Sequence, residues 1–128
     1  MSSTSVELPD LYLQEARPDA EPRQVTSSGT DAYYEHPLVE PEMVTFEHPD
    51  GGPLWAALFR PAEPNAERSA IMHIHGGGYR QFAHRGYSVY GYATHLGFVN
   101  YMLQQGYTVL DFDYRGSAGF GRDYRTDI

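Results

Sequence analysis

Residues 70–79 read Ala-Ile-Met-His-Ile-His-Gly-Gly-Gly-Tyr, an apolar run that ends in three consecutive glycines. The apolar part, together with Ser69, predicts a buried strand that ends at His75. Residues without a Cβ atom let the backbone turn sharply and bring its N–H groups close to a ligand. The stretch therefore predicts a strand that ends in a tight, ligand-facing turn.

The residues on both sides of this strand predict the rest of a sheet. Residues 43–48 alternate like a half-buried strand, residues 54–59 form a second strand, and Pro49-Asp50-Gly51-Gly52 between them predicts a hairpin turn. Helical periodicity follows over residues 95–105, with Gly106 placed as a C-terminal cap, and residues 107–114 predict a further strand. Strand, helix and strand in this order predict a βαβ unit with parallel strands. The fold class is therefore α/β, an antiparallel hairpin followed by βαβ, which is the N-terminal part of an α/β-hydrolase sheet.

The chain divides into three parts by composition. Residues 1–30 predict either a mobile tail or two strands, at 11–14 and 23–26. Residues 31–41 predict a linker, because Pro37 and Pro41 disfavour helix at the residues before them. Residues 42–128 carry the sheet pattern.

Composition excludes several classes of function. The formal net charge is −8 and the isoelectric point is near 5.0, which argues against nucleic acid or an anionic membrane as a partner. There is no cysteine, hence no disulfide, thiolate metal site or cysteine nucleophile. No apolar run approaches the roughly 18 residues of a membrane span, and residues 1–10 lack the pattern of a secretory signal. We expect a soluble chain whose compartment, cytoplasmic or periplasmic and secreted, the sequence leaves open.

The glycine turn predicts the charge-stabilising part of an acyl-transfer site. In lipases and esterases of the α/β-hydrolase type, an HGGG turn supplies N–H donors to the oxyanion hole, and each donor lowers the barrier by roughly 3–4 kcal/mol. Gly77 and Gly78 are the predicted donors. The alternatives are a turn without a ligand or a phosphate-binding loop; the second would need a lysine or the GxGxxG spacing, and neither is present.

Histidines around the turn allow a second interpretation. His73 and His75 are two residues apart on a strand, so both rings should project from one face. A metal site would need further ligands, for which His84 and His95 are candidates. Because nothing else resembles a ligand signature, we expect the histidine before the glycines to brace the turn by hydrogen bonds, and we predict no metal or other cofactor.

A second glycine-rich loop, residues 113–122, follows the last predicted strand. Ser117 does not fit a nucleophile elbow, because position 115 is Arg where G-x-S-x-G needs Gly, and we interpret it as a loop serine that bonds its own backbone. Arg115 is either an ion-pair anchor to Asp111 or Asp113, which we favour, or a binder of substrate carboxylates. Tyr79 lies where a substrate-facing side chain is expected.

Three motifs together resemble the prolyl oligopeptidase (S9) family of serine peptidases. They are residues 75–81 (HGGGYRQ), residues 104–107 (QQGY) and residues 113–121 (DYRGSAGFG). Residues 41–46 and 50–54 look like the hairpin by which those chains enter the catalytic domain. Residues 10–13 and 23–26 are similar to closing strands of the preceding β-propeller. The resemblance covers nearly the whole chain and is specific from about residue 41.

The resemblance implies an α/β-hydrolase domain that cleaves short peptides through an acyl-enzyme, behind a propeller that selects substrates by size. It also implies a Ser, Asp and His triad downstream of the RGSxGxG loop, so this chain would be a fragment with oxyanion-hole elements but no triad, inactive alone. Many members use a tyrosine side chain for the oxyanion where this chain has His75. That departure brings the predicted hole, made by His75, Gly77 and Gly78, closer to the HGGG esterases.

Two other functions stay open at this point. The first is an HGGG-type carboxylesterase or lipase fragment. The second is a non-catalytic α/β interaction module, because an unfinished parallel sheet exposes an unpaired edge and an apolar face. The expected ligand is a peptide substrate for the peptidase and an ester substrate for the esterase. The sequence predicts neither the peptide specificity nor the oligomeric state.

Overall fold

A computed structural model of the chain describes residues 4–36, 38–77, 79–86 and 93–127. Four strands form one mixed sheet: β3 (Glu42–Glu47), β4 (Pro53–Phe59), β5 (Ala70–Ile74) and β6 (Thr108–Asp113), in the order β3-β4-β6-β5. β3 and β4 form the predicted antiparallel hairpin, and β5 and β6 are parallel, as expected of the βαβ unit. The predicted fold class is confirmed. What the pattern did not give is the antiparallel pairing of β4 with β6, which joins the hairpin to the βαβ unit.

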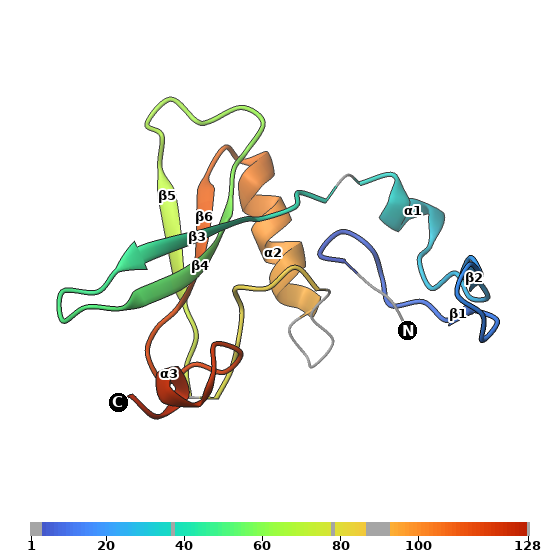
Figure 1. Ribbon diagram of the computed structural model, residues 1–128. Helices are drawn as coiled ribbons and strands as arrows, with labels where there is room; N and C mark the ends of the chain where they lie inside the picture. Colours follow the sequence, from blue (N-terminus) through green and yellow to red (C-terminus); the bar gives the residue numbers. More distant parts are fainter. Residues whose placement is uncertain (1–3, 37, 78, 87–92, 128) are drawn as a thin grey trace.

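Helix α2 (Ala93–Gln104) connects β5 to β6 and covers one face of the sheet (Figure 1). It ends as predicted at Gly106, whose φ is +79°. The N–H groups of Gly106 and Tyr107 donate to the carbonyls of Leu103 and Met102, at 2.9 and 3.0 Å, which closes the helix in a Schellman motif. A Cβ at Gly106 would lie 2.6 Å from the backbone nitrogen of Asn65, so both the turn and the packing require glycine.

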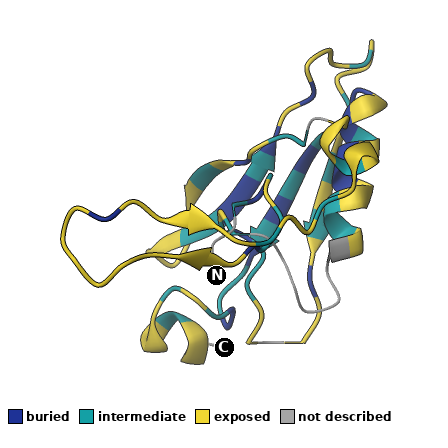
Figure 2. Cartoon of the chain, turned by 90° about the vertical axis from the view of Figure 1, so that its right-hand side faces the viewer, coloured by how far each residue is buried: buried dark blue, intermediate teal, exposed yellow. Residues whose placement is uncertain are grey.

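The core lies between α2 and the sheet. Its buried side chains come from β4, the loop after β5, α2 and β6: Ala57, Phe59, Ala83, Val99, Leu103 and Val109. The opposite face of β5 is open, with Met72 and Ile74 both 59% exposed. β5 is also an edge of the sheet. The sheet is thus covered by a helix on one face only among the described residues, and Figure 2 shows how burial is concentrated in the strands beside that helix.

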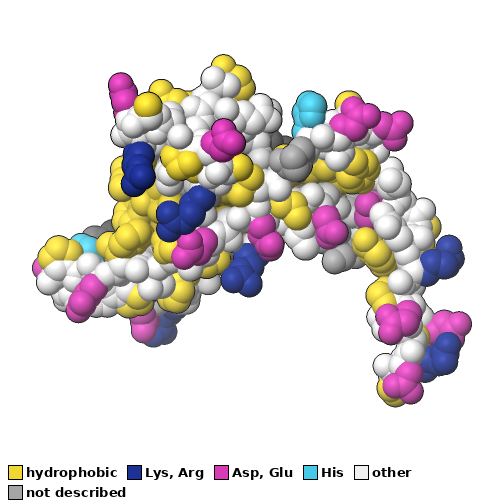
Figure 3. Space-filling model, turned by 90° about the horizontal axis from the view of Figure 1, so that it is seen from above, with side chains coloured by type: hydrophobic (Ala, Val, Ile, Leu, Met, Phe, Trp, Pro, Cys, Tyr) yellow, Lys and Arg dark blue, Asp and Glu magenta, His cyan; other side chains and the backbone are white. Residues whose placement is uncertain are grey.

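The N-terminal part projects away from the sheet as an arm (Figures 1 and 3). It holds β1 (Tyr12–Leu13) and β2 (Arg23–Gln24), paired antiparallel at the predicted positions. A single helical turn, α1 (Asp31–Tyr34), begins inside the predicted linker, where the Thr30 side chain caps it by accepting from the N–H of Tyr33. This turn was not predicted from the sequence, because four residues are too few to show helical periodicity. The division at residues 30 and 41 stays a prediction.

One more short helix, α3 (Arg122–Thr126), lies near the C-terminus. It follows residues 115–119 of the second glycine-rich loop, which are called the RGSAG loop below. None of the described helices has the length and apolar character that crossing a bilayer would require.

Candidate functional site

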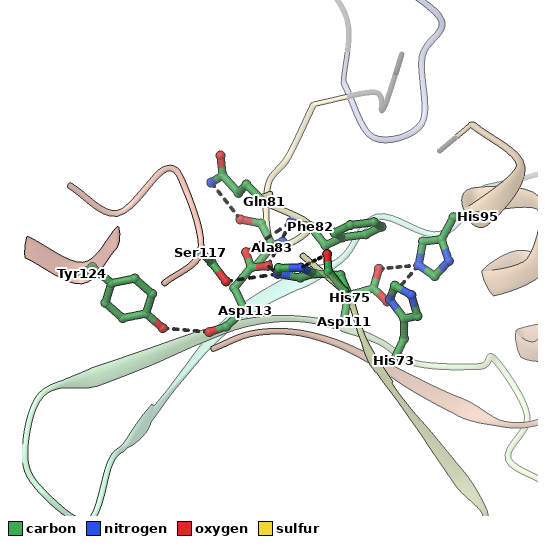
Figure 4. A network of polar contacts seen from close by, with 11 residues as sticks. His73, His75, Gln81, Phe82, Ala83, His95, Asp111, Asp113, Ser117 and Tyr124 are labelled. Atoms are coloured by element: carbon green, nitrogen blue, oxygen red, sulfur yellow. Dashed lines mark hydrogen bonds and ion pairs between the residues drawn. The ribbon is translucent and has the colours of Figure 1, made fainter. Parts of the chain in front are cut away.

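The glycine turn and the RGSAG loop lie next to each other, because they follow the ends of the parallel neighbours β5 and β6. Two backbone hydrogen bonds join them: the N–H of Tyr79 donates to the carbonyl of Gly116 at 3.2 Å, and that of Ala118 donates to the carbonyl of Arg80 at 2.8 Å. Ligands of open α/β sheets bind at this carboxyl edge. The two motifs singled out in the sequence therefore form one candidate site (Figure 4).

Asp113 organises this site from the end of β6. Its side chain is fully buried, and its carboxylate accepts the backbone N–H of Phe82 at 3.0 and 3.2 Å and that of Ala83 at 2.9 Å. It also lies 3.1 Å from Nε2 of His75. Burial raises the pKa of the Asp113 carboxyl, and the two N–H donors and His75 oppose that shift. The carboxylate thereby fixes the loop that follows the glycine turn to the sheet.

His75 is enclosed at the base of the turn. Its ring stacks between Phe82 and Tyr114, with centroids 5.3 and 4.7 Å away, and the residue is 5% exposed. Nε2 also lies 3.0 Å from Oγ of Ser117. Its ring therefore braces the turn, as the sequence analysis expected of a histidine before glycines. Its predicted share in an oxyanion hole would have to come through the main chain.

Ser117, His75 and Asp113 resemble a catalytic triad in composition but not in geometry. In a triad the imidazole uses one ring nitrogen for the serine and the other for the aspartate. Here the single atom Nε2 meets both the Ser117 hydroxyl and the Asp113 carboxylate. A nitrogen that donates its proton to Asp113 cannot also accept the serine proton. Ser117 is, moreover, fully buried, so a substrate cannot reach it.

The sequence prediction that the Ser117 hydroxyl bonds its own backbone is corrected by the contact between this hydroxyl and Nε2 of His75. The hydroxyl bonds a histidine 42 positions earlier in the chain. Its local backbone bond is made instead by the amide, which donates to the carbonyl of Tyr114 at 3.0 Å.

The glycine turn itself leaves main-chain donors available. Among the residues that the structure describes, none accepts a hydrogen bond from the N–H of Gly76 or Gly77. An added Cβ at either glycine would meet nothing within 4 Å, so the space beside the turn is open. Gly77 has a φ of +60°, the left-handed region that favours glycine. Gly78, the other predicted donor, lies outside the described residues.

Tyr79 continues the turn in a conformation that is uncommon for a side chain of its size. Its φ is +74°, and the residue is 64% exposed. The guanidinium of Arg125, from α3, lies 4.6 Å from the ring centroid. This cation–π contact and the bond to Gly116 hold the residue in place. Tyr79 thus stands at the surface beside the turn, where the sequence analysis expected a substrate-facing side chain.

Arg115 points away from the site, and its predicted partners are corrected. It pairs with Asp127 at 2.8 Å and with Asp50 at 3.4 Å, and it contacts His48. The sequence prediction favoured an ion pair with Asp111 or Asp113. They alternate onto the α2 face of β6, however, whereas Arg115 reaches the hairpin turn between β3 and β4. Arg115 therefore ties the RGSAG loop to the hairpin.

A second polar cluster lies beside the first on the same face of the sheet. His73 and His75 do share a face, as predicted: both rings contact Phe82. His73 meets Asp111 of β6, its register partner, and His95 of α2. Burial lowers the pKa of His73, and His95 adds to this effect while Asp111 opposes it.

His84, the other candidate ligand of the sequence analysis, is not part of either cluster. Its ring accepts the N–H of Gly86 at 3.1 Å.

Two residues central to this geometry were not among the sequence predictions for the site. Asp113 was considered only as a partner for Arg115, and Phe82 was not considered. Period-two alternation offered a signal for Asp113, since Val109, Asp111 and Asp113 occupy the buried positions of β6. A charged residue at such a position needs donors, which here come from a loop 30 residues earlier.

Known proteins resemble this chain over most of its length. No protein-family model matches it. An uncharacterized peptidase of Bacillus subtilis, YuxL, is 27% identical over 106 residues, which are 81% of this chain and 15% of that protein. The acylaminoacyl peptidase of Pyrococcus horikoshii superposes with a TM-score of 0.68 at 24% identity, over 95% of this chain and 18% of its own.

Dipeptidyl peptidase 4 of Porphyromonas gingivalis gives a TM-score of 0.69 at 17% identity, over 98% of this chain and 18% of its own. At these identities the two solved structures establish the shared fold. The chain spans less than a fifth of the length of each relative. Together the similarities confirm the resemblance drawn from the sequence, which is to the prolyl oligopeptidase (S9) family of serine peptidases.

Proposed function

We propose that this chain supplies the oxyanion-hole part of a serine-type peptidase that hydrolyses short peptides through an acyl-enzyme. The observation that carries the proposal is the glycine turn at the end of β5, where no described residue accepts a hydrogen bond from the N–H of Gly76 or Gly77 and an added Cβ at either would meet nothing within 4 Å. Preorganised N–H donors of this kind stabilise the negative charge that develops on a carbonyl oxygen.

The surroundings of the turn support its rigidity. Asp113 holds the loop after the turn through two main-chain N–H groups, and His75 fills the space beneath. A donor that is already fixed needs no reorganisation when the charge develops. In this proposal His75 and Asp113 are positioning residues, and Gly77 is the donor that touches the reacting atom.

The nucleophile, the base and the orienting acid are not part of the proposed contribution of this chain. Ser117 is the serine that meets a histidine, and its burial and the shared Nε2 support a structural role for it rather than that of a nucleophile. We therefore expect that the 128-residue chain alone does not react with a fluorophosphonate probe. Covalent labelling that disappears in Ser117→Ala would contradict this part of the proposal.

The activity itself is tested in a chimera. Residues 42–128 replace the matching segment of the Bacillus subtilis peptidase, and cleavage of a peptide p-nitroanilide is compared with that of a p-nitrophenyl ester. We expect peptide cleavage, and we expect Gly77→Val to lower kcat by at least tenfold with a smaller change in KM. Valine strains the left-handed position and crowds the open side of the turn.

The control is Gly52→Val, which is also at a positive φ with open space around it but lies in the hairpin turn. If Gly52→Val and Gly77→Val reduce kcat equally, the effect is one of folding and the proposed role of the turn is wrong. A folded chimera that cleaves the ester but not the peptide would favour the esterase alternative.

A further inference from the structure

We propose that His73, His95 and Asp111 form a binding site for a divalent transition-metal ion of the zinc type. The three residues come from three elements, β5, α2 and β6, which only the fold brings together (Figure 4). One ligand atom of each lies within 4.8 Å of the other two. Two imidazole nitrogens and a carboxylate oxygen are a ligand set that such ions accept.

The distances suit a single ion. Nδ1 of His73 is 3.2 Å and Nε2 of His95 is 2.9 Å from Oδ1 of Asp111. Zinc–ligand bonds of about 2.0–2.1 Å place tetrahedral ligand atoms about 3.4 Å apart. Small rotations about the final imidazole torsions, which are soft, would open the group to that spacing.

An unsatisfied atom points to a ligand. Nδ1 of His73 is buried and completes no hydrogen bond that meets distance and angle criteria among the described residues, although Oδ1 of Asp111 lies 3.2 Å away. Asp111 directs both of its oxygens to Nε2 of His95, each at 2.9 Å. Buried polar atoms in folded proteins are nearly always paired. An ion held between the two rings and the carboxylate would satisfy this nitrogen.

The three side chains of the proposed metal site differ in their exposure to solvent. The side chain of Asp111 is 3% exposed, that of His95 13% and that of His73 30%. Three protein ligands with one open side leave a fourth coordination position for water or another ligand. His75 is not a ligand, because its Nε2 already meets Asp113 and Ser117. The metal site is therefore separate from the brace beneath the glycine turn and does not depend on the proposed peptidase function.

The test is the uptake of Zn²⁺ by the purified chain, measured by equilibrium dialysis and metal quantification. We expect one tightly bound ion per chain. His95→Gln should weaken binding at least tenfold, whereas His36→Gln should leave it unchanged, because His36 lies on the exposed segment before β3, outside the group. The absence of stoichiometric uptake, or equal affinity in His95→Gln and the unaltered chain, would overturn the proposal.

A second measurement does not depend on a variant that folds. In the unaltered chain, titration with Zn²⁺ should shift the imidazole NMR signals of two of the six histidines, His73 and His95. Co²⁺ in the same site should give the visible absorption of a four-coordinate nitrogen and oxygen complex. If the shifted signals belong to other histidines, the ion binds elsewhere and the assignment is wrong.

Discussion

The N-terminal arm, residues 4–36, is stabilised by different interactions from those that stabilise the sheet region, residues 42–127. Among the described residues of the arm, Ala20 is the one buried apolar side chain, and β1 and β2 are exposed throughout. The sheet region has a continuous apolar core beneath α2. An arm with so little apolar burial cannot offset its loss of chain entropy in the way the sheet does.

Each region nevertheless has a buried aspartate that accepts hydrogen bonds from several donors, Asp10 in the arm and Asp113 in the sheet region. Asp10 accepts from the hydroxyls of Thr26 and Ser28, both at 2.8 Å, from the N–H of Ser28 at 3.0 Å and from the amide of Gln24 at 2.9 Å. These donors, the Thr26 hydroxyl above all, lower the pKa of Asp10. At Asp113 burial dominates, and its pKa rises.

The two buried carboxylates therefore have different structural roles. In the arm, the hydrogen bonds of Asp10 connect the segments where an apolar core is missing, and they favour the charged form of the carboxylate. In the sheet it positions a loop, and its charge opposes folding even though its hydrogen bonds are required. Three predictions test this contrast.

The largest effect is expected from removal of a core side chain. Phe59 is 3% exposed, and Phe59→Ala should lower the free energy of unfolding by about 4 kcal/mol. Leu13→Ala in the arm, where Leu13 is 59% exposed, should change it by less than about 0.5 kcal/mol. Urea denaturation followed by circular dichroism measures both. Similar losses in the two variants would show that the arm belongs to the same cooperative unit.

The next effect separates the hydrogen bonds of Asp113 from its charge. Asp113→Ala leaves the N–H groups of Phe82 and Ala83 without their acceptor, and we expect a loss of about 3 kcal/mol in the same denaturation experiment. Asp113→Asn keeps an acceptor oxygen and removes the buried charge, so its loss should be clearly smaller. Equal losses in the two variants would contradict the positioning role.

The smallest effect is a pH dependence of opposite sign in the two regions. The folded pKa of Asp113 lies above its ordinary value of 3.8, so between those two values the folded state binds more protons, and stability from this group rises as the pH falls. The folded pKa of Asp10 lies below 3.8, so its contribution is present above 3.8 and is lost as the pH falls through the folded pKa.

Carboxyl and amide NMR signals across an acid titration follow both groups. The urea midpoint of the unaltered chain should rise relative to that of Asp113→Asn as the pH falls from 6 toward 3, because only the unaltered chain binds a proton at this position. The amide signal of Ser28, which bonds Asp10, should report the loss in the arm. If the midpoint of the unaltered chain instead falls relative to that of Asp113→Asn on acidification, the sign assigned to Asp113 is wrong.

Much of the fold could be predicted because its signals are local. The hairpin turn, the apolar runs of β4 to β6 and the Gly106 cap each depend on a few neighbouring residues, and the structure places them within about two residues of the expected positions. The one-turn helix α1 and the pairing of β4 with β6 were missed. The helical turn is too short to show a periodic pattern, and the strand pairing joins residues 50 or more positions apart.

The sequence by itself determined that a glycine turn ends β5, that His73 and His75 share a face, and that Ser117 lacks the elbow of a nucleophile. Each follows from spacing along the chain, because backbone geometry fixes which way neighbouring side chains point. Only the tertiary structure decided which partners those residues meet. In the fold, Ser117 contacts His75, Arg115 pairs with Asp50 and Asp127, and His73 lies beside His95 and Asp111. Contacts between elements depend on the order of the strands and on the path of the loops, which no local sequence pattern encodes.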